Sequence, residues 1–230
     1  MIAAVIPVLN EAGAIGPTLR QLPPSLIDHI IVVDGGSTDG TQGEARAAGA
    51  EVLHEPRRGY GRACLSGAKR AHALGAGVVL FLDGDGADAA ECAASLIDPV
   101  VNGDADFVLA SRIAKREHGS IGLHQILAGR LIGGAVGLLS GVRYTDMCAF
   151  RAIRTDALLA LSMQEMTYGW NLEMQIRAAS AGLRIQEIPL PYRNRIAGRS
   201  KVAGNLRGSV RAATRILVTL ARVSYELRRA

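Results

Sequence analysis

The sequence predicts an α/β protein whose mostly parallel sheet carries helices on both faces, and three observations support this fold class. Short apolar runs alternate with helix-like segments over the first 110 residues, which is typical of parallel sheets built from strand–helix–strand units. The run 78–82 is entirely apolar and leads into Asp83-Gly84-Asp85, as expected of a strand that is buried on both faces. Hydrophobic residues make up 49% of the chain and aromatic residues only 4%, so we expect an aliphatic core.

The strands expected in the first half are apolar runs that stop at polar residues. They cover residues 2–9, 29–33, 51–54, 78–82 and 106–110. Apolar residues at helical spacing lie between them and predict helices. These helices cover residues 14–22, 42–50, 62–74 and 89–102.

The second half begins with a segment of low charge, rich in Gly and Leu, at residues 118–141. The elements expected after it are a short strand or bend followed by a helix in 146–161, a helix over 167–181, a strand over 184–190, a basic loop over 193–201 and a helix over 206–228. We therefore divide the chain into one domain, residues 1–205, with halves 1–112 and 113–205, and a C-terminal helix in 206–230.

Composition narrows the class of protein. The three cysteines are scattered and form neither a disulfide framework nor a metal-binding spacing, which favours a reducing cytoplasm. The N-terminus lacks the basic start of a signal peptide. The longest apolar run without charge, residues 131–142, is shorter than the roughly 18 residues of a membrane-spanning helix.

Charge is concentrated at the C-terminal end. Residues 193–230 contain ten Lys/Arg and one Asp/Glu, whereas the rest of the chain is slightly acidic, so we expect an anionic partner for this end. On a helical projection, five arginines of the last helix fall within an arc of about 80°, opposite an apolar face. We expect this helix to dock on the core with a solvated arginine face, and a membrane surface is the alternative. Nucleic acid is disfavoured because aromatic residues are scarce.

Polar residues follow the expected strands as an ordered series of motifs. The series is Pro7-x-x-Asn10-Glu11, Val33-Asp34-x-x-Ser37-x-Asp39-Gly40-Thr41, Arg58-Gly59-x-Gly61-x-Ala63-x-x-x-Gly67 and Asp83-x-Asp85. It resembles the family 2 glycosyltransferases, which have the Rossmann-like GT-A fold. Further motifs resemble the dolichyl-phosphate mannosyltransferase branch, whose members move sugars onto polyprenyl phosphates. These are Ala110-Ser111-Arg112, Asp146-x-x-x-Phe150-Arg151-Ala152 and Arg195-x-x-Gly198-x-Ser200-Lys201.

The resemblance covers roughly residues 2–205 and implies a metal-dependent, inverting transfer from a nucleotide sugar, with UDP or GDP as the nucleotide. The residues that it implies for the base and ribose are Pro7, Glu11, Val32 and Asp34. Asp83 and Asp85, with Gly84 between them, are implied to hold Mg²⁺ or Mn²⁺ across the diphosphate. The implied phosphate-binding residues are Arg112, Arg195 and Lys201. We expect the loop 193–201 to close over the diphosphate, and we expect Asp39 either at the site or as a helix N-cap.

The acceptor is less clearly specified. The branch implies a polyprenyl phosphate, presented at the inner face of the membrane. A soluble hydroxyl acceptor is the alternative, with Asp146 as a general base just before a helix. The sequence departs from the branch at Ala87, where a Gln usually helps the metal, and a water or Asp88 is expected to fill the gap. Only His124 and Arg130 are candidates for the acceptor phosphate.

A non-catalytic nucleotide- or lipid-binding protein and a nucleotidyltransferase are further alternatives, although the acidic Asn10-Glu11 disfavours the latter. The sequence predicts neither the sugar nor the oligomeric state.

Overall fold

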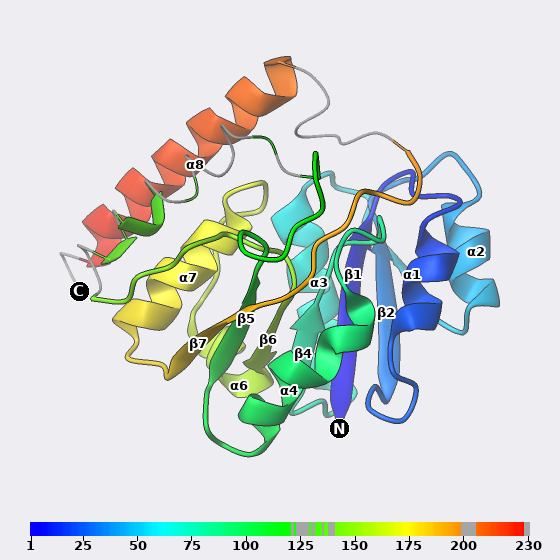
Figure 1. Cartoon of the computed structure of the whole chain (residues 1–230), viewed down its shortest axis with the longest axis horizontal. Coiled ribbons are helices and arrows are strands. Elements are labelled where there is room, and N and C mark those ends of the chain that lie inside the picture. The colour runs from blue at the N-terminus through cyan, green and yellow to red at the C-terminus, as the bar shows by residue number, and fades with distance from the viewer. Residues whose placement is uncertain are drawn as a thin grey trace.

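The computed structural model contains one seven-stranded sheet between two layers of helices (Figure 1). It describes residues 1–120, 122, 129, 132–134, 136–137 and 141–198, the backbone of 206–227 and the side chains of 214–226. The strands are β1 Ile2–Val8, β2 His29–Asp34, β3 Glu51–His54, β4 Val78–Phe81, β5 Phe107–Ser111, β6 Arg151–Arg154 and β7 Ile185–Pro189. Their order in the sheet is β3-β2-β1-β4-β6-β5-β7. Only β6 runs antiparallel to its neighbours, so the expected mostly parallel sheet is confirmed.

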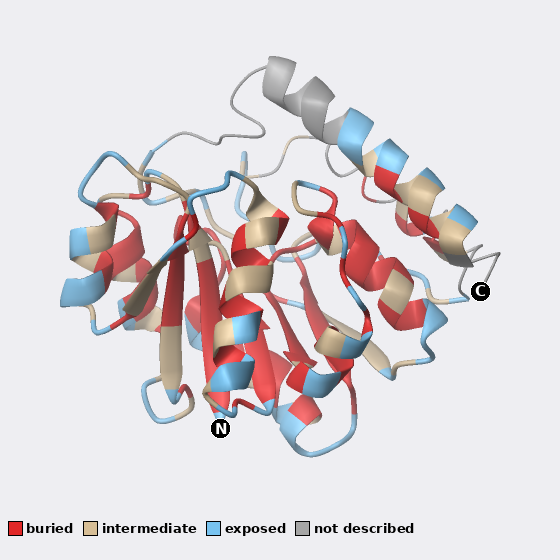
Figure 2. Cartoon of the chain, turned by 180° about the vertical axis from the view of Figure 1, so that it is seen from behind, coloured by how far each residue is buried: buried red, intermediate tan, exposed pale blue. Residues whose placement is uncertain are grey.

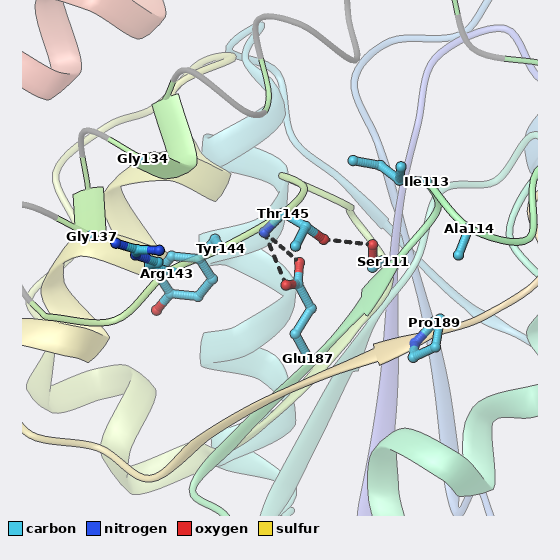
Figure 3. Close-up of a pocket in the computed structure, with 10 residues that line it drawn as sticks. All are labelled: Ser111, Ile113, Ala114, Gly134, Gly137, Arg143, Tyr144, Thr145, Glu187 and Pro189. Atoms are coloured by element: carbon cyan, nitrogen blue, oxygen red, sulfur yellow. Dashed lines mark hydrogen bonds between the residues drawn. The ribbon is translucent and has the colours of Figure 1, made fainter.

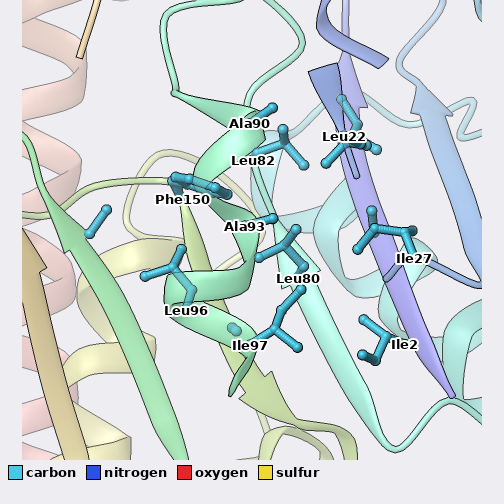
Figure 4. Close-up of a cluster of buried hydrophobic side chains, with 14 of the residues drawn as sticks. Ile2, Leu22, Ile27, Leu80, Leu82, Ala90, Ala93, Leu96, Ile97 and Phe150 are labelled. Carbon is cyan, nitrogen blue, oxygen red and sulfur yellow. The ribbon is translucent and has the colours of Figure 1, made fainter. Parts of the chain in front are cut away.

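Helices cover both faces of this sheet. Their bounds are α1 Ile15–Gln21, α2 Thr41–Ala47, α3 Tyr60–Ala73, α4 Ala93–Val101, α6 Thr155–Ala160, α7 Trp170–Ser180 and α8 Leu206–Leu227, with a 3₁₀ turn at Ala90–Cys92 before α4. Side chains of α1, α2 and α4 pack in one apolar cluster, which Figure 4 shows against β4. Side chains of α3, α6, α7 and α8 pack in a second cluster on the other face.

The sequences of β1 and β4 do not alternate between apolar and polar residues because both faces of these strands are buried. In β1, Ala4 and Ile6 point into the first cluster and Ala3 and Val5 into the second. Strand side chains alternate between faces, and here both faces are covered. The register pairs Val8 with Asp34 across β1 and β2, so the carboxyl ends of neighbouring parallel strands meet at one edge.

The motif Arg58-Gly59-x-Gly61 brings α3 against a distant loop. A Cβ on Gly61 would lie 2.3 Å from the carbonyl oxygen of Glu165, and one on Gly59 would lie 2.2 Å from that of Met166. In addition, the backbone N–H of Arg62 donates to the carbonyl of Met166 at 3.1 Å. These glycines therefore permit a close packing of two backbones that any side chain would prevent.

Of the five arginines expected on a solvated face of the last helix, Arg215 and Arg222 have described side chains. Arg215 is exposed and Arg222 is half-buried, and both form ion pairs with the body of the protein. Arg215 pairs with the buried Glu165, and Arg222 pairs with the fully buried Glu173. Glu226 of α8 accepts from Arg177 of α7 at 2.6 Å. Thus the arginines help to attach α8 to α7, while several of its apolar residues face outward (Figure 2). Within the described part of the chain, no helix is long and apolar enough to cross a membrane.

Candidate functional site

The acidic loop after β4 is held tightly against β1 and α1. A Cβ on Gly84 would lie 2.7 Å from Val8 Cγ1 and 3.2 Å from Ile15 Cδ1, so glycine lets Asp83 and Asp85 sit close to the strand ends. The backbone N–H of Ala87 donates to Asp85 Oδ1 at 2.9 Å. The loop is therefore preorganised, with the Asp83 carboxylate half-buried and that of Asp85 buried.

Asp88 supports this loop from within. Its Oδ2 accepts from the backbone N–H of Asp83 at 3.1 Å, and its Oδ1 accepts from Cys148 Sγ at 3.7 Å. Ala87 is buried and adds no ligand. The expectation that a water or Asp88 fills the gap left at Ala87 stays a prediction.

The electrostatics of the loop favour a bound cation. Burial, together with the charges of Asp85 and Asp88, raises the pKa of Asp83 to about 8. Burial and Asp85 likewise raise the pKa of Asp88 to about 6. Such raised pKa values indicate that the negative charges of these carboxylates are not fully balanced by nearby positive charges or hydrogen bonds. Hard oxygen ligands of this kind suit Mg²⁺ or Mn²⁺. Among the described residues, no group of three or more His, Cys, Asp or Glu is arranged to hold a metal ion.

The segment 193–198 lies over the acidic loop. The backbone N–H of Arg193 donates to the carbonyl of Ala87 at 2.8 Å, and that of Ile196 donates to the carbonyl of Asp85 at 3.0 Å. Gly86 has a φ of +76°, and a Cβ there would lie 2.3 Å from Ile196 Cδ1. Only glycine therefore allows this approach without strain.

Arg195 connects this segment to the acidic loop and to the residue Glu11 that follows β1. Its guanidinium pairs with the carboxylate of Asp85 and with Glu11 Oε2, the latter at 2.7 Å. A cation thus already lies against the residues expected to hold the metal and the nucleotide. Lys201, His124 and Arg130, the other cationic candidates, lie outside the described residues.

The residues implied for base and ribose binding mostly serve the framework. Asp34 is fully buried, and its carboxylate accepts from the backbone N–H groups of Gly36 and Ser37 and from Gln42 Nε2. Val32 is fully buried, and its side chain packs in the first apolar cluster. Pro7 is half-buried in β1.

Asp39 ties two loops of this edge together. Its carboxylate accepts from the backbone N–H of Thr41 at 3.0 Å and from that of Ala12 at 3.2 Å. Gly40 occupies the N-cap position of α2, so Asp39 is not the N-cap residue itself. It fixes the loop after β1 to the start of α2.

Arg112 and Asp146 form a bidentate ion pair. Arg112 Nε donates to Asp146 Oδ2 and Arg112 Nη2 donates to Oδ1, each at 2.7 Å. The backbone N–H groups of Arg112 and Met147 donate to the same carboxylate. Burial alone would raise the pKa of Asp146, but the hydrogen bonds and charge of Arg112 outweigh it and the pKa lies below its usual value.

This environment does not suit a general base. A base needs an accessible lone pair and a pKa near the working pH, whereas Asp146 is buried and committed to Arg112. The structure also corrects its position, because Asp146 lies in the loop before β6 and not just before a helix. Asp146 therefore orients Arg112.

Three residues that sequence reasoning missed hold this pair in place. Glu187 of β7 accepts from the backbone N–H of Asp146 at 3.1 Å, and Gln175 Nε2 of α7 donates to its carbonyl at 2.8 Å. The ring of Tyr192 lies 5.1 Å from the Arg112 guanidinium carbon. Glu187 and Gln175 stand next to apolar residues in their elements, and this was the available signal for them.

A pocket of about 760 Å³ has Arg143 in its lining (Figure 3). Ser111 and Ile113, which flank Arg112 in the chain, line it, and Pro189 and Tyr144 contribute apolar surface. Glu187 stands in its wall with its carboxylate turned to the backbone N–H of Thr145. The pocket is thus largely apolar, with Arg143 as a cationic residue in its lining.

The chain is similar to proteins of one family. The family described as Glycosyl transferase family 2 matches residues 3–158. An uncharacterized glycosyltransferase of Mycobacterium tuberculosis is 33% identical over 213 residues, which cover 91% of this chain and 93% of that relative. The undecaprenyl-phosphate mannosyltransferase of Micrococcus luteus is 31% identical over 222 residues, which cover 90% of this chain and 89% of that relative.

A solved structure shares the fold. Glucosyl-3-phosphoglycerate synthase of Mycobacterium tuberculosis, in complex with Mn²⁺, UDP-glucose and phosphoglyceric acid, matches with a TM-score of 0.73 and 22% identity. The match covers 97% of this chain and 79% of the synthase chain. At this identity the similarity concerns the fold alone.

Proposed function

Because the chain belongs to glycosyl transferase family 2, we propose that it transfers a sugar, with inversion, from a UDP- or GDP-sugar to a polyprenyl phosphate. The observation that carries the proposal is the edge of the sheet where Asp83 and Asp85 lie under Arg195. A nucleoside diphosphate bound there meets carboxylates that can hold a divalent cation and a guanidinium that can bind phosphate.

The acidic loop is the proposed metal site. Asp83 and Asp85 would hold Mg²⁺ or Mn²⁺, and their poorly compensated charge fits a cation. A metal ion held there stabilises the charge that develops on the departing nucleoside diphosphate. Arg195 and Arg112 approach Asp83 from different parts of the chain, and both lower its pKa, so both are placed to contact phosphate groups. Lys201 remains a proposed phosphate-binding residue.

Two observations support a lipid-linked phosphate as the acceptor. A relative that shares 31% identity over 90% of this chain is an undecaprenyl-phosphate mannosyltransferase. The pocket lined by Ile113, Tyr144 and Pro189 is largely apolar and has Arg143 in its lining, which suits hydrocarbon next to a phosphate group. A phosphate acceptor is already a nucleophile and requires no general base, in agreement with the commitment of Asp146 to Arg112.

A soluble hydroxyl acceptor is the second candidate. A structure with the same fold binds phosphoglyceric acid, which shows that the fold accommodates a soluble acceptor. That reaction requires a base, and Asp146 would have to leave Arg112 to serve as one.

Transfer assays with Asp146→Asn distinguish the two acceptors. With UDP- or GDP-sugars and Mn²⁺, we expect transfer to a polyprenyl phosphate, slowed in the variant but with an unchanged pH profile, since Asp146 acts through Arg112. Asp156→Asn, at an exposed carboxylate paired with Arg154, serves as the control and should match the wild type. Transfer to a soluble alcohol alone, abolished by Asp146→Asn, would establish the second candidate.

A further inference from the structure

The outward face of α8 carries an apolar stripe. Four exposed residues recur at helical spacing and fall within an arc of about 100°; they are Leu217, Val218, Ala221 and Tyr225. Leu217 is 61% exposed, Val218 48% and Tyr225 56%. Large apolar side chains so exposed on one helix face usually mark an interaction surface.

The opposite face of α8 fixes this orientation. Val223 and Thr219 are fully buried against the body of the protein, and Thr219 Oγ1 donates to Glu165 Oε2 at 3.1 Å. A Cβ on Gly169 would lie 2.3 Å from Thr219 Oγ1, so the helix packs closely here. The ion pairs of Arg215 and Arg222 along one edge then hold the stripe away from the body.

We propose that this stripe inserts into the surface of an anionic lipid membrane, so that α8 is an interfacial helix. Interfacial helices combine an apolar face with adjacent basic residues, and tyrosine suits the boundary between lipid and water. The charge is complementary, because residues 206–230 contain six arginines and Glu226 as the one acid. Insertion by apolar side chains differs from a purely electrostatic attachment, since Arg215 and Arg222 already pair within the protein.

The size of the stripe favours lipid over a second copy of the chain. Its three large side chains expose on the order of a few hundred Å², whereas a stable protein interface buries about 800 Å² on each partner. Figure 1 shows the N-terminal end of α8 on the same side of the molecule as the carboxyl ends of the parallel strands. This inference deepens the proposed function and rests on it, because a membrane surface would present the lipid acceptor to that edge.

Vesicle flotation of the full chain tests the inference. The probe is a mixture of phosphatidylcholine and phosphatidylglycerol, at low and physiological salt. We expect the double variant Leu217→Gln/Val218→Gln to lower the partition coefficient at least about tenfold, while Val101→Gln, at a residue 58% exposed on α4, leaves it unchanged. We also expect wild-type binding to weaken but persist at physiological salt, since insertion is not screened. Both variants change exposed side chains, and their thermal unfolding should match the wild type.

The outcomes that overturn the inference are distinct. They are absence of flotation, equal flotation of wild type and double variant, and a dimer in sedimentation that the double variant dissociates. Transfer to a polyprenyl phosphate in detergent is measured alongside. If that transfer is intact and flotation is absent, the docking surface is wrong and the proposed function stands. If flotation depends on the stripe but no transfer occurs, the proposed function is wrong.

Discussion

A divalent cation that binds Asp85 must compete with the guanidinium of Arg195 for that carboxylate. Its guanidinium pairs with Asp85, 110 residues away in sequence, and with Glu11, 184 residues away. All three residues were found from the sequence through their motifs. Their pairing was not, because sequence spacing does not determine which of several charges meet after folding. The same limit applies to Asp34, whose carboxylate turned out to bind its own loop.

Replacing Arg195 should affect metal and nucleotide in opposite directions. We expect Arg195→Gln to raise the affinity for Mn²⁺ alone, because a competing cation leaves Asp85, and to lower the affinity for a nucleoside diphosphate by about tenfold. Calorimetry with each ligand measures both. Arg193→Gln is the matched control, since Arg193 pairs with Glu91. A weaker affinity of Arg195→Gln for Mn²⁺ alone would contradict this account.

At the scale of helices and strands, the elements themselves were more predictable from the sequence than their arrangement. Most helices and strands were predictable because their apolar periodicity is local. The position of β6 between β4 and β5 was not, since nothing in the sequence of 151–154 specifies its neighbours. The ion pairs of α8 could not be predicted for a related reason: the partners of its arginines, Glu165 and Glu173, come from other segments.

Two glycine substitutions separate packing from helix propensity. Gly61→Ala adds a Cβ 2.3 Å from the Glu165 carbonyl oxygen, and we expect it to lower the free energy of unfolding by about 1–3 kcal/mol. Gly43→Ala on α2 has no neighbour within 4 Å of the new Cβ and should raise it by about 0.5–1 kcal/mol. Urea unfolding measures both changes. Stabilisation by Gly61→Ala would show that α3 does not pack as described.

Asp106 connects the three strands of the second half at their other edge. Its carboxylate accepts from Arg184 Nη2 at 2.9 Å and pairs with Arg154 at 3.2 Å, and hydrogen bonds from Arg184 lower its pKa to about 2. The ionised form is favoured in the folded state, so its contribution to stability is complete above the usual pKa of 3.8 and is lost as the pH falls through about 2.

Asp106→Asn should therefore destabilise the protein in a pH-dependent way. We expect a loss of about 1–2 kcal/mol in the free energy of unfolding at pH 7, which shrinks as the pH approaches 2. Urea midpoints over this range provide the measurement, with Asp104→Asn at an exposed neighbouring carboxylate as the control. A difference from wild type that stays constant with pH would be inconsistent with the lowered pKa.

At the scale of the whole molecule, two sets of strands meet at one site. The strands β1, β2 and β4 bring the acidic loop and Glu11 to one edge, while β5, β6 and β7 position Arg112, Asp146 and the pocket. The segment 193–198 links the two sets by hydrogen bonds to Ala87 and Asp85. A donor and an acceptor could thus be held on opposite sides of the acidic loop, as glycosyl transfer requires.

The central claim is that this acidic loop binds a nucleotide sugar through a metal ion, and calorimetry on Asp85→Asn tests it most directly. Asp98→Asn, at an exposed carboxylate on α4, is the control. With Mn²⁺ present, wild type and control should bind the UDP- or GDP-sugar alike, and Asp85→Asn should bind it about 10–100-fold more weakly, with its thermal unfolding preserved. Undiminished affinity of Asp85→Asn in the presence of Mn²⁺ would contradict the account.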